Sequence, residues 1–272
     1  MTAVALPSAA HKRLARWSPP QVTPRALHVW QRNRDVYMNV WRSELIWPII
    51  EPLVTLLALG LGLGTFVELE NGQEYIDFVG PALIAVFSMW TATAECGWGS
   101  YTRMDSQGTF EAILATPVSV DEVTTGEIIW GATRSILGVF YIMVMVTIMG
   151  GISSPMALLI FPLALLPGVM FSAISLAYTA VARSVSSLNY FFATYVTPQF
   201  WLSGAFFPLS ELPKWVSVVA WFTPAYHVVR IYRALAAGDP ELHHLADVAW
   251  IVVVTAAAYL IAITMMRRRL IK

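Results

Sequence analysis

Six long apolar runs alternate with short polar segments along the chain. A bilayer-spanning helix needs roughly 20 predominantly apolar residues, and such windows fall at about 45–65, 76–99, 128–150, 156–182, 188–208 and 247–266. The fourth contains Pro162 and Pro167, which predicts a tilted or kinked helix because proline removes a backbone hydrogen bond. The segments between the runs are too short for a soluble domain. The pattern therefore predicts an all-α polytopic membrane protein, with one six-helix transmembrane domain over residues 23–268.

The segment before the first run, "TPRALHVWQRNRDVYMNVWRSEL", predicts an amphipathic interface helix over residues 23–43. Thr23 is a favourable N-cap and Pro24 suits a first helical turn. One side carries apolar residues and another carries arginines: Leu27, Trp30, Tyr37 and Trp41, against Arg25, Arg32 and Arg42. We expect the helix to lie flat at the membrane surface with its rings toward lipid. Two roles fit it: an anchor alone, or also part of a docking surface for a cytoplasmic partner.

The polar stretch 103–122, between the second and third runs, predicts a short helix. Thr109 is its expected N-cap, Glu111 complements the helix dipole, and Pro117 ends it. Apolar residues at i, i+3 and i+4 form one face: Phe110, Ile113 and Leu114. Two roles fit this face. It packs as an elbow on its own bundle, or it enters the groove of a partner protein.

A capping box follows directly. Ser119 and Glu122 are a serine and a glutamate three residues apart, an arrangement that satisfies two free N–H groups at the start of a helix. This pair predicts a helix that begins here and continues into the third apolar run.

The segment between the fifth and sixth runs, residues 209–240, is apolar but interrupted by Pro213, Pro224 and Pro240. This predicts short re-entrant or interfacial helices rather than another span. Aromatic residues crowd in and just before it: Phe206, Phe207, Trp215, Trp221, Phe222 and Tyr226. They fit an aromatic belt at the outer interface, or alternatively a surface that stacks on sugar rings or guides an acyl chain.

Four charged residues fall within or at the ends of the apolar runs: Glu51, Glu95, Glu127 and Arg134. A lone charge at mid-bilayer costs roughly 2.5–3.5 kcal/mol on insertion scales, so such residues usually pair or face an aqueous cavity. We expect Arg134 to pair with Glu95 or Glu127 and to fix the second and third helices around the 103–122 loop. The alternatives are a network that serves only folding and a proton relay.

The composition agrees with a membrane location, and the charge placement predicts an orientation. Of the 272 residues, 57% are hydrophobic and 12% are charged, about half the charged share of a soluble domain. Lysine and arginine gather at both ends and in two connections: Lys12, Arg13, Arg16, Arg25, Arg32, Arg34, Arg42, Arg103, Arg183, Arg267, Arg268, Arg269 and Lys272. Because basic residues favour the cytoplasmic side, we expect both termini there, as a flexible tail over 1–22 and a basic tail over 267–272. The acidic "ELENGQEYID" after the first run is then outside.

Several chemistries find no support in the residues. The single cysteine, Cys96, allows no internal disulfide, and the serines lack a His/Asp partner set. The histidines form no metal-binding pattern, since His243 and His244 are adjacent and the others are isolated. None of the three lysines follows a glycine, so the phosphate-binding loop of an ATPase is missing. We expect no catalytic residue, no metal site, no cofactor bound by this chain and no nucleic-acid partner.

Three stretches resemble the membrane subunits of type-2 ABC exporters. More narrowly, they resemble the NodJ-type permeases, which export nodulation factors (lipo-oligosaccharides). The stretches are "EPLVTLLALGLGLG" in the first run, "TFEAILATPVSVDEVTTGEIIWGATRS" after the second, and "WLSGAFFPLSELPKWVSVVAWFTPAYHVVRIYRAL" from the fifth. The resemblance covers about residues 25–268.

The resemblance implies a homodimer in the bacterial inner membrane, with two copies of a separate cytoplasmic ABC ATPase that carries ATP and Mg. It implies that residues 109–116 are the coupling helix in a groove of that ATPase, and that residues 204–240 form an outer gate. The implied cargo is a lipid-linked glycan that contacts membrane lipid: a lipo-oligosaccharide, glycolipid or polysaccharide. The alternatives are the same exporter with a drug, heme or other amphipathic cargo, a non-transporting membrane scaffold or sensor, and an ion-coupled carrier.

Overall fold

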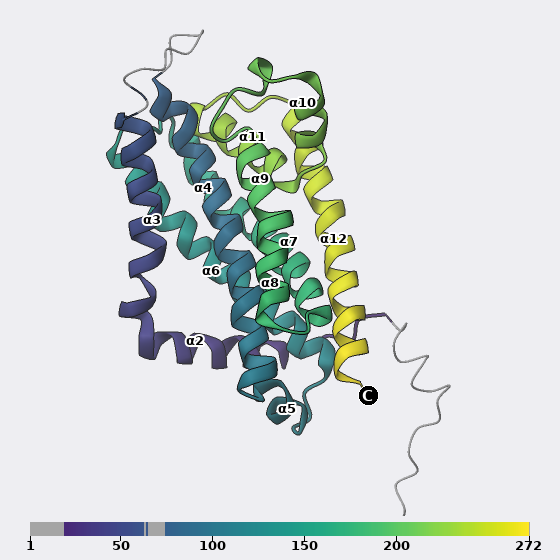
Figure 1. Ribbon diagram of the computed structural model, residues 1–272. Helices are drawn as coiled ribbons and strands as arrows, with labels where there is room; N and C mark the ends of the chain where they lie inside the picture. Colours follow the sequence, from purple (N-terminus) through teal and green to yellow (C-terminus); the bar gives the residue numbers. More distant parts are fainter. Residues whose placement is uncertain (1–18, 63, 65–73, 272) are drawn as a thin grey trace, which may run out of the picture.

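Helices form all the regular structure in the described part of the chain, which confirms the all-α prediction. The computed structural model describes residues 19–62, 64 and 74–271. In it the long helices stand side by side as one bundle (Figure 1). Residues 1–18, the stretch 65–73 with most of the acidic segment, and Lys272 lie outside the described residues, and so do the predictions made for them.

The two ends of the bundle differ. At one end, α2 (Ala26–Glu44) lies across the long helices, close to the short α5 (Thr109–Leu114) and the C-terminal end of α12 (His243–Leu270) (Figure 1). At the other end, the short helices α10 (Lys214–Trp221) and α11 (Pro224–Ala237) cover the bundle. Helices therefore occur in the chain segments for which an interface helix, a short loop helix and a broken outer segment were predicted, and the placement of these helices relative to a membrane stays a prediction.

Four of the described helical stretches are long and apolar enough to cross a bilayer: Tyr75–Ser106, Val120–Ile148, Pro155–Val181 and His243–Leu270. They contain α4 (Tyr75–Ala94), α6 (Val120–Ile148), α7 (Ile160–Val181) and α12. The capping box predicted for α6 is confirmed, because Ser119 Oγ accepts from the Glu122 N–H and the Glu122 carboxylate accepts from the Ser119 N–H at 2.6 Å.

The first and fifth predicted spans appear as shorter or interrupted pieces. The first is α3 (Ile46–Leu56), continued by the π-helical η1 (Leu57–Gly62). A bend of 46° separates it from α2, and the count of possible spans rises to five if that bent pair is one span. The fifth is α8 (Val185–Phe191), η6 (Phe192–Val196) and α9 (Thr197–Leu202), shorter than the predicted 188–208 window at its end. Six spans therefore remain a prediction.

Close helix packing depends on small residues of α6. A Cβ added at Gly126 would lie 2.6 Å from Val29 Cβ and 2.7 Å from the Ala26 carbonyl oxygen, so α2 approaches α6 only because glycine is there. A Cβ at Gly131 would lie 2.4 Å from Ser172 Oγ and 2.6 Å from Cys96 Sγ. Small residues at helix interfaces are typical of membrane bundles, where close backbone approach maximises dispersion contacts.

Arg233 of α11 fastens the outer segment to the bundle. Its Nε donates to the Phe78 carbonyl at 2.8 Å, and Nη2 donates to the carbonyls of Gly204 and Ala205 at 2.8 and 2.9 Å. The guanidinium also lies 3.6 Å from the centroid of the Phe78 ring. Tyr75 adds a further bond, from its hydroxyl to the Phe206 carbonyl at 2.9 Å. Backbone without regular pairing at this depth is stable only when such donors satisfy it.

Candidate functional site

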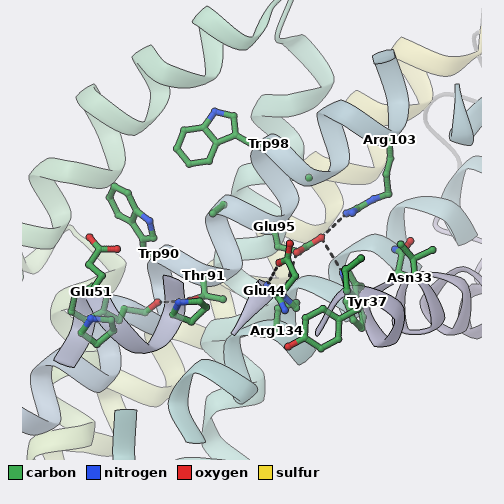
Figure 2. Close-up of a pocket in the computed structure, with 18 of the residues that line it drawn as sticks. Asn33, Tyr37, Glu44, Glu51, Trp90, Thr91, Glu95, Trp98, Arg103 and Arg134 are labelled. Carbon is green, nitrogen blue, oxygen red and sulfur yellow. Dashed lines mark hydrogen bonds and ion pairs between the residues drawn. The ribbon is translucent and has the colours of Figure 1, made fainter. Parts of the chain in front are cut away.

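A pocket of about 440 Å³ lies between α2 and α3 on one side and α4 and α6 on the other (Figure 2). Its lining combines aromatic and aliphatic residues with polar and charged ones. The first group is Val36, Tyr37, Val40, Pro48, Pro52, Phe87, Trp90, Ala94, Trp98, Trp130 and Ile142. The second is Asn33, Glu44, Glu51, Thr91, Glu95, Gly99, Arg103 and Arg134. A pocket of this size and mixed chemistry suits an amphipathic small molecule.

Arg103 joins two glutamates at the polar end of the pocket. Its Nη2 lies 2.9 Å from Glu95 Oε1 and 2.7 Å from Glu127 Oε2, and its Nε donates to Glu127 Oε2 at 3.0 Å. Glu127 is only 1% exposed. A charge buried this deeply without a partner costs several kcal/mol, so Arg103 and Glu127 stabilise each other. From the sequence, Arg103 was predicted to lie in a connection, and its pair with Glu127 was not predicted.

All the described hydrogen-bond partners of the Glu127 carboxylate are donors. The amide nitrogen of Asn33 donates to Oε1 at 2.7 Å. The Ser100 hydroxyl donates to Oε2 at 2.6 Å, beside the two bonds from Arg103. These contacts suit an ionised carboxylate, which only accepts. They also join α2, α4 and α6 at one point.

Arg134 pairs with Glu95, which is one of the two partners predicted for it. Its Nε lies 3.4 Å from Glu95 Oε2, and its Nη2 donates to Glu44 Oε2 at 2.8 Å. The guanidinium carbon also lies 4.3 Å from the centroid of the Tyr37 ring. The other alternative, a pair with Glu127, is wrong, because Arg103 occupies that carboxylate. Glu95 thus bridges the two arginines, and Figure 2 shows the three side chains converging.

Local backbone geometry explains why Arg103 reaches this cluster. The helix of α4 does not end near residue 99 as predicted but continues through two π-helical segments, η3 (Glu95–Gly99) and η4 (Thr102–Ser106). Such segments recur at functional sites. A Cβ at Gly99 would lie 2.9 Å from Glu95 Oε1 and 3.3 Å from Arg103 Nη1, so glycine leaves room for the pair. Gly99, the second glycine of "ECGWGS", was the sequence signal for this close approach of side chains.

Glu51 lies in the same pocket but takes no part in this cluster (Figure 2). It is half-buried on α3, and its backbone carbonyl accepts from Thr55 Oγ1 at 2.9 Å. Within the described part of the chain, its carboxylate forms neither a hydrogen bond nor an ion pair.

The face of α5 that we expected to meet a partner packs on the bundle instead. Phe110 is 0% exposed and lies in a buried cluster, with Ile113 and Leu114 packed partly buried against it. In this conformation Phe110 is therefore not accessible to a partner, and the docking of α5 on an ATPase stays a prediction. The exposed residues of α5 and of the turn after it are Glu111, Ala112, Ala115, Thr116 and Pro117. These residues are the part of this loop that a partner can reach.

The start of α5 also differs from the prediction. Its N-cap is Gly108, at φ +63°, rather than Thr109. Glycine takes this left-handed conformation without the strain that a Cβ causes. Thr109 is the first helical residue and accepts a long hydrogen bond of 3.4 Å from Arg32 Nη2. The helix ends at Leu114, two residues before the predicted end at residue 116, and turns follow through Pro117.

α2 is tied to the loops around α5. Arg25 Nη1 donates to the Pro117 carbonyl at 2.8 Å, and the Thr23 hydroxyl donates to the capping glutamate, Glu122. Thr23 is therefore not the N-cap of α2, a position that Arg25 holds. Burial lowers the pKa of Arg32, and the nearby positive charge of Arg103 lowers it further, so α2 lies within the field of the buried cluster.

Two of the four α2 residues predicted to face lipid turn to the bundle. Trp30 Nε1 donates to Thr133 Oγ1 at 2.9 Å, and Tyr37 packs edge-on against Trp130 at 5.7 Å between ring centroids. Leu27 and Trp41 are exposed, as expected. The buried stripe of α2 is Ala26, Val29 and Asn33. Their spacing of three and four residues was a signal that the sequence analysis missed.

The predicted outer residues lie at the opposite end of the bundle from α2, and none of them lines this pocket. Phe206 is buried at 2% exposed, Tyr226 is half-buried, and the others are exposed: Phe207, Trp215 and Trp221. Beneath them, His227 is buried rather than isolated, with Nδ1 2.7 Å from Asp247 Oδ1. Within residues 19–62, 64 and 74–271, no group of three His, Cys, Asp or Glu side chains could hold a metal ion.

Comparison with known proteins places these features in a family. The family model described as "ABC-2 type transporter" matches residues 26–236. "Nodulation protein J" of Rhizobium meliloti (strain 1021) is 29% identical over 242 residues, which cover 89% of this chain and 92% of that protein. The protein of the same name from Rhizobium leguminosarum bv. trifolii is 29% identical over 244 residues, covering 90% and 93%. "Inner membrane transport permease YadH" of Escherichia coli (strain K12) is 21% identical over 244 residues, covering 88% and 93%. The chain belongs to the ABC-2 type transporter family of multi-pass membrane permease subunits.

Proposed function

We propose that this chain is the permease subunit of an ATP-driven exporter that moves a lipo-oligosaccharide, or a related glycolipid or polysaccharide, out across the bacterial inner membrane. The pocket between α2–α3 and α4–α6 carries this proposal. It combines aromatic walls, which suit sugar faces and acyl chains, with a polar end, as an amphipathic cargo needs. The kinship with proteins named for nodulation supports the cargo class.

A groove beside the pocket offers a route of entry. It has a volume of about 370 Å³ and is lined by Arg32, Thr102 and Gln107 together with residues of the pocket. Those shared residues are Asn33, Val36, Trp98, Gly99 and Arg103. The groove therefore leads from the end of the bundle that holds α2 and α5 to the pocket. In our proposal this end faces the cytoplasm, so cargo enters from the cytoplasm or the inner leaflet.

Coupling to ATP is proposed to run through α5. This chain acts as a homodimer with two copies of a separate ATPase, which carries ATP and Mg, and each ATPase meets the exposed side of α5. Closure of the ATPases moves α5 and the preceding η4, and with it Arg103. Because Arg103 binds Glu95 and Glu127 at the pocket, the movement reaches the cargo site. In this proposal α3–η1 and α8–α9 complete six spans.

Reconstitution tests the proposal. The chain is purified with its co-purifying proteins, which are identified, and is then inserted into lipid vesicles with the ATPase that accompanies it. We expect a stoichiometric ATPase and ATP-dependent movement of a fluorescent lipo-oligosaccharide to the opposite leaflet. A catalytically inactive ATPase is the matched control and should stop transport.

Each alternative predicts a different result. A scaffold or sensor co-purifies with no ATPase. An ion-coupled carrier continues to export without ATP hydrolysis but stops when the proton gradient is collapsed. An exporter of drugs retains ATP-dependent transport but ignores the lipo-oligosaccharide. Any of these three results contradicts the proposal.

A further inference from the structure

The Glu51 carboxylate is the part of the pocket that the proposed export function leaves without a role. The two arginines of the pocket are already engaged. Arg103 binds Glu95 and Glu127, and Arg134 binds Glu44 and Glu95. Neither guanidinium therefore remains to neutralise Glu51, which has no described side-chain partner of its own.

The pocket as a whole keeps a net negative charge. The negative groups are three carboxylates that line the pocket and one directly behind it: Glu44, Glu51, Glu95 and Glu127. The positive groups are two guanidinium groups in the pocket and one in the adjoining groove: Arg103, Arg134 and Arg32. Ionisable residues at membrane depth are rare and usually have a partner in the bundle or in a substrate. The Glu51 carboxylate is thus the one pocket carboxylate left open to a positive charge supplied from outside the described residues.

Aromatic rings line the pocket together with Glu51. Phe87, Trp90 and Trp98 come from α4 and its extension, and Figure 2 shows Trp90 and Glu51 on the same side, away from Arg103. Ring faces attract cations, most strongly the face of tryptophan. Pro48 and Pro52 of α3 add apolar surface at this end. A carboxylate among rings and apolar groups suits an ammonium group that carries a hydrocarbon chain.

We propose that this pocket binds amphiphiles whose head group carries a protonated amine, with the ammonium at Glu51 and the apolar part along the aromatic wall. The inference rests on the proposed function, because it takes the pocket as the cargo site, and it deepens that function by naming the head-group chemistry. Two sources share this chemistry: a lipo-oligosaccharide with a free amino sugar, and a simple alkylamine.

Binding to the full-length chain in lipid nanodiscs, without ATPase or ATP, tests the inference. Three probes of equal chain length are titrated by calorimetry, with empty nanodiscs subtracted: octyl 2-amino-2-deoxyglucoside, octylamine and octyl glucoside. We expect both amines to bind at least about tenfold more tightly than the neutral glucoside, since a charge-assisted contact is lost in the latter. Tighter binding of the amino glycoside identifies an amino sugar as the source, and tighter binding of octylamine identifies a simple amine.

The variant Glu51→Gln removes the charge and keeps the shape. We expect it to lose the preference for amines while its affinity for octyl glucoside stays unchanged. Glu211→Gln, at an exposed glutamate of the opposite end, is the matched control and should keep the preference. If Glu51→Gln does not fold, the comparison of the amine probes with octyl glucoside on the wild-type chain decides whether the pocket prefers amines. Equal binding of amine and neutral probes overturns the inference, and so does a preference that survives in Glu51→Gln.

The test separates this inference from the proposed function. If amine selectivity depends on Glu51 but no ATP-dependent export is found, the result supports the amine-binding site and contradicts the proposed export function. If lipo-oligosaccharide is exported but no amine selectivity is found, the result supports the proposed export function and contradicts the amine-binding site.

Discussion

Glu127 is surrounded by donors on both of its oxygens, and this determines what a substitution there costs. Asn33 donates to one oxygen, while Ser100 and Arg103 donate to the other. A carboxylate accepts on both sides, whereas an amide accepts on one side and donates on the other. The site therefore distinguishes glutamate from glutamine although the two have the same shape.

We expect Glu127→Gln to lower the free energy of unfolding by about 3 kcal/mol, because its amide nitrogen faces a donor in either orientation and Arg103 loses a buried counter-charge. Thermal unfolding in nanodiscs measures this. Glu111→Gln, on the exposed side of α5, should change stability by less than about 0.5 kcal/mol. Equal melting temperatures for the two variants would show that the Glu127 cluster is not held as described.

At the scale of the elements, α2 acts as a strap across the end of the bundle that holds α5. Its buried stripe contacts α6 at Gly126, and its two ends are tied by Thr23 to Glu122 and by Glu44 to Arg134. The same strap forms one wall of the pocket. Its position on α6 therefore sets the width of the pocket.

Gly126→Leu should push α2 away from α6, because even a Cβ at that position lies 2.6 Å from Val29 Cβ. Overpacking of this kind costs about 1–3 kcal/mol, and we expect a lower melting temperature together with faster labelling of a cysteine placed at Val29. Gly62→Leu, where the nearest atom to an added Cβ is the Leu57 carbonyl oxygen at 3.9 Å, is the control. Unchanged labelling at residue 29 would contradict the strap.

The two sides of α5 predict opposite outcomes for two substitutions. Ala112→Trp places a bulky ring on the exposed side and should abolish co-purification of the ATPase while the chain stays folded. Phe110→Ala leaves a cavity in the buried cluster and should cost about 3–5 kcal/mol of stability. Ala237→Trp, at an exposed alanine of the outer end, is the control for ring size. An ATPase that still binds Ala112→Trp would exclude α5 as the docking helix.

At the scale of the whole molecule, the end of the bundle that holds α2 and α5 contains the pocket, and short helices close the opposite end. At the α10 end, Arg233 joins α11 to α4 and to the segment before α10, because its three hydrogen bonds reach the carbonyls of Phe78, Gly204 and Ala205. In the proposed function, release of cargo away from the α2 end requires this segment to move, and the bonds of Arg233 are among those that hold it against the bundle.

Arg233→Met should free the segment before α10, since the part-buried carbonyls of Gly204 and Ala205 lose their donor and methionine has no N–H group to replace it. We expect faster labelling of a cysteine at Ser210, at least about tenfold, and a destabilisation of a few kcal/mol. Arg183→Met, an exposed arginine of the loop at the α5 end, should leave labelling unchanged. Equal labelling rates in both variants would show that Arg233 does not hold the segment.

Single elements show what could be predicted and what could not. The apolar runs predict α4, α6, α7 and α12, and the Ser119 capping box predicts the start of α6, because both signals are local. The direction of Phe110 could not be predicted, since an apolar triplet looks the same whether its partner is its own bundle or another protein. The Arg103 pair was missed because it depends on two π-helical segments, which change which side of the helix each residue faces.

The long sequence separation of the strap contacts has a consequence for biosynthesis. Asn33, Trp30 and Thr23 bond to residues 94, 103 and 99 positions later in the chain. At a synthesis rate of roughly 5–20 residues per second, α2 leaves the ribosome about 5–20 s before its partners exist. During that interval its polar and aromatic side chains can only meet lipid head groups or a membrane insertase. A nascent chain arrested before residue 119 should therefore carry α2 on the membrane surface, undocked, and the strap closes only when the third span has entered the bilayer.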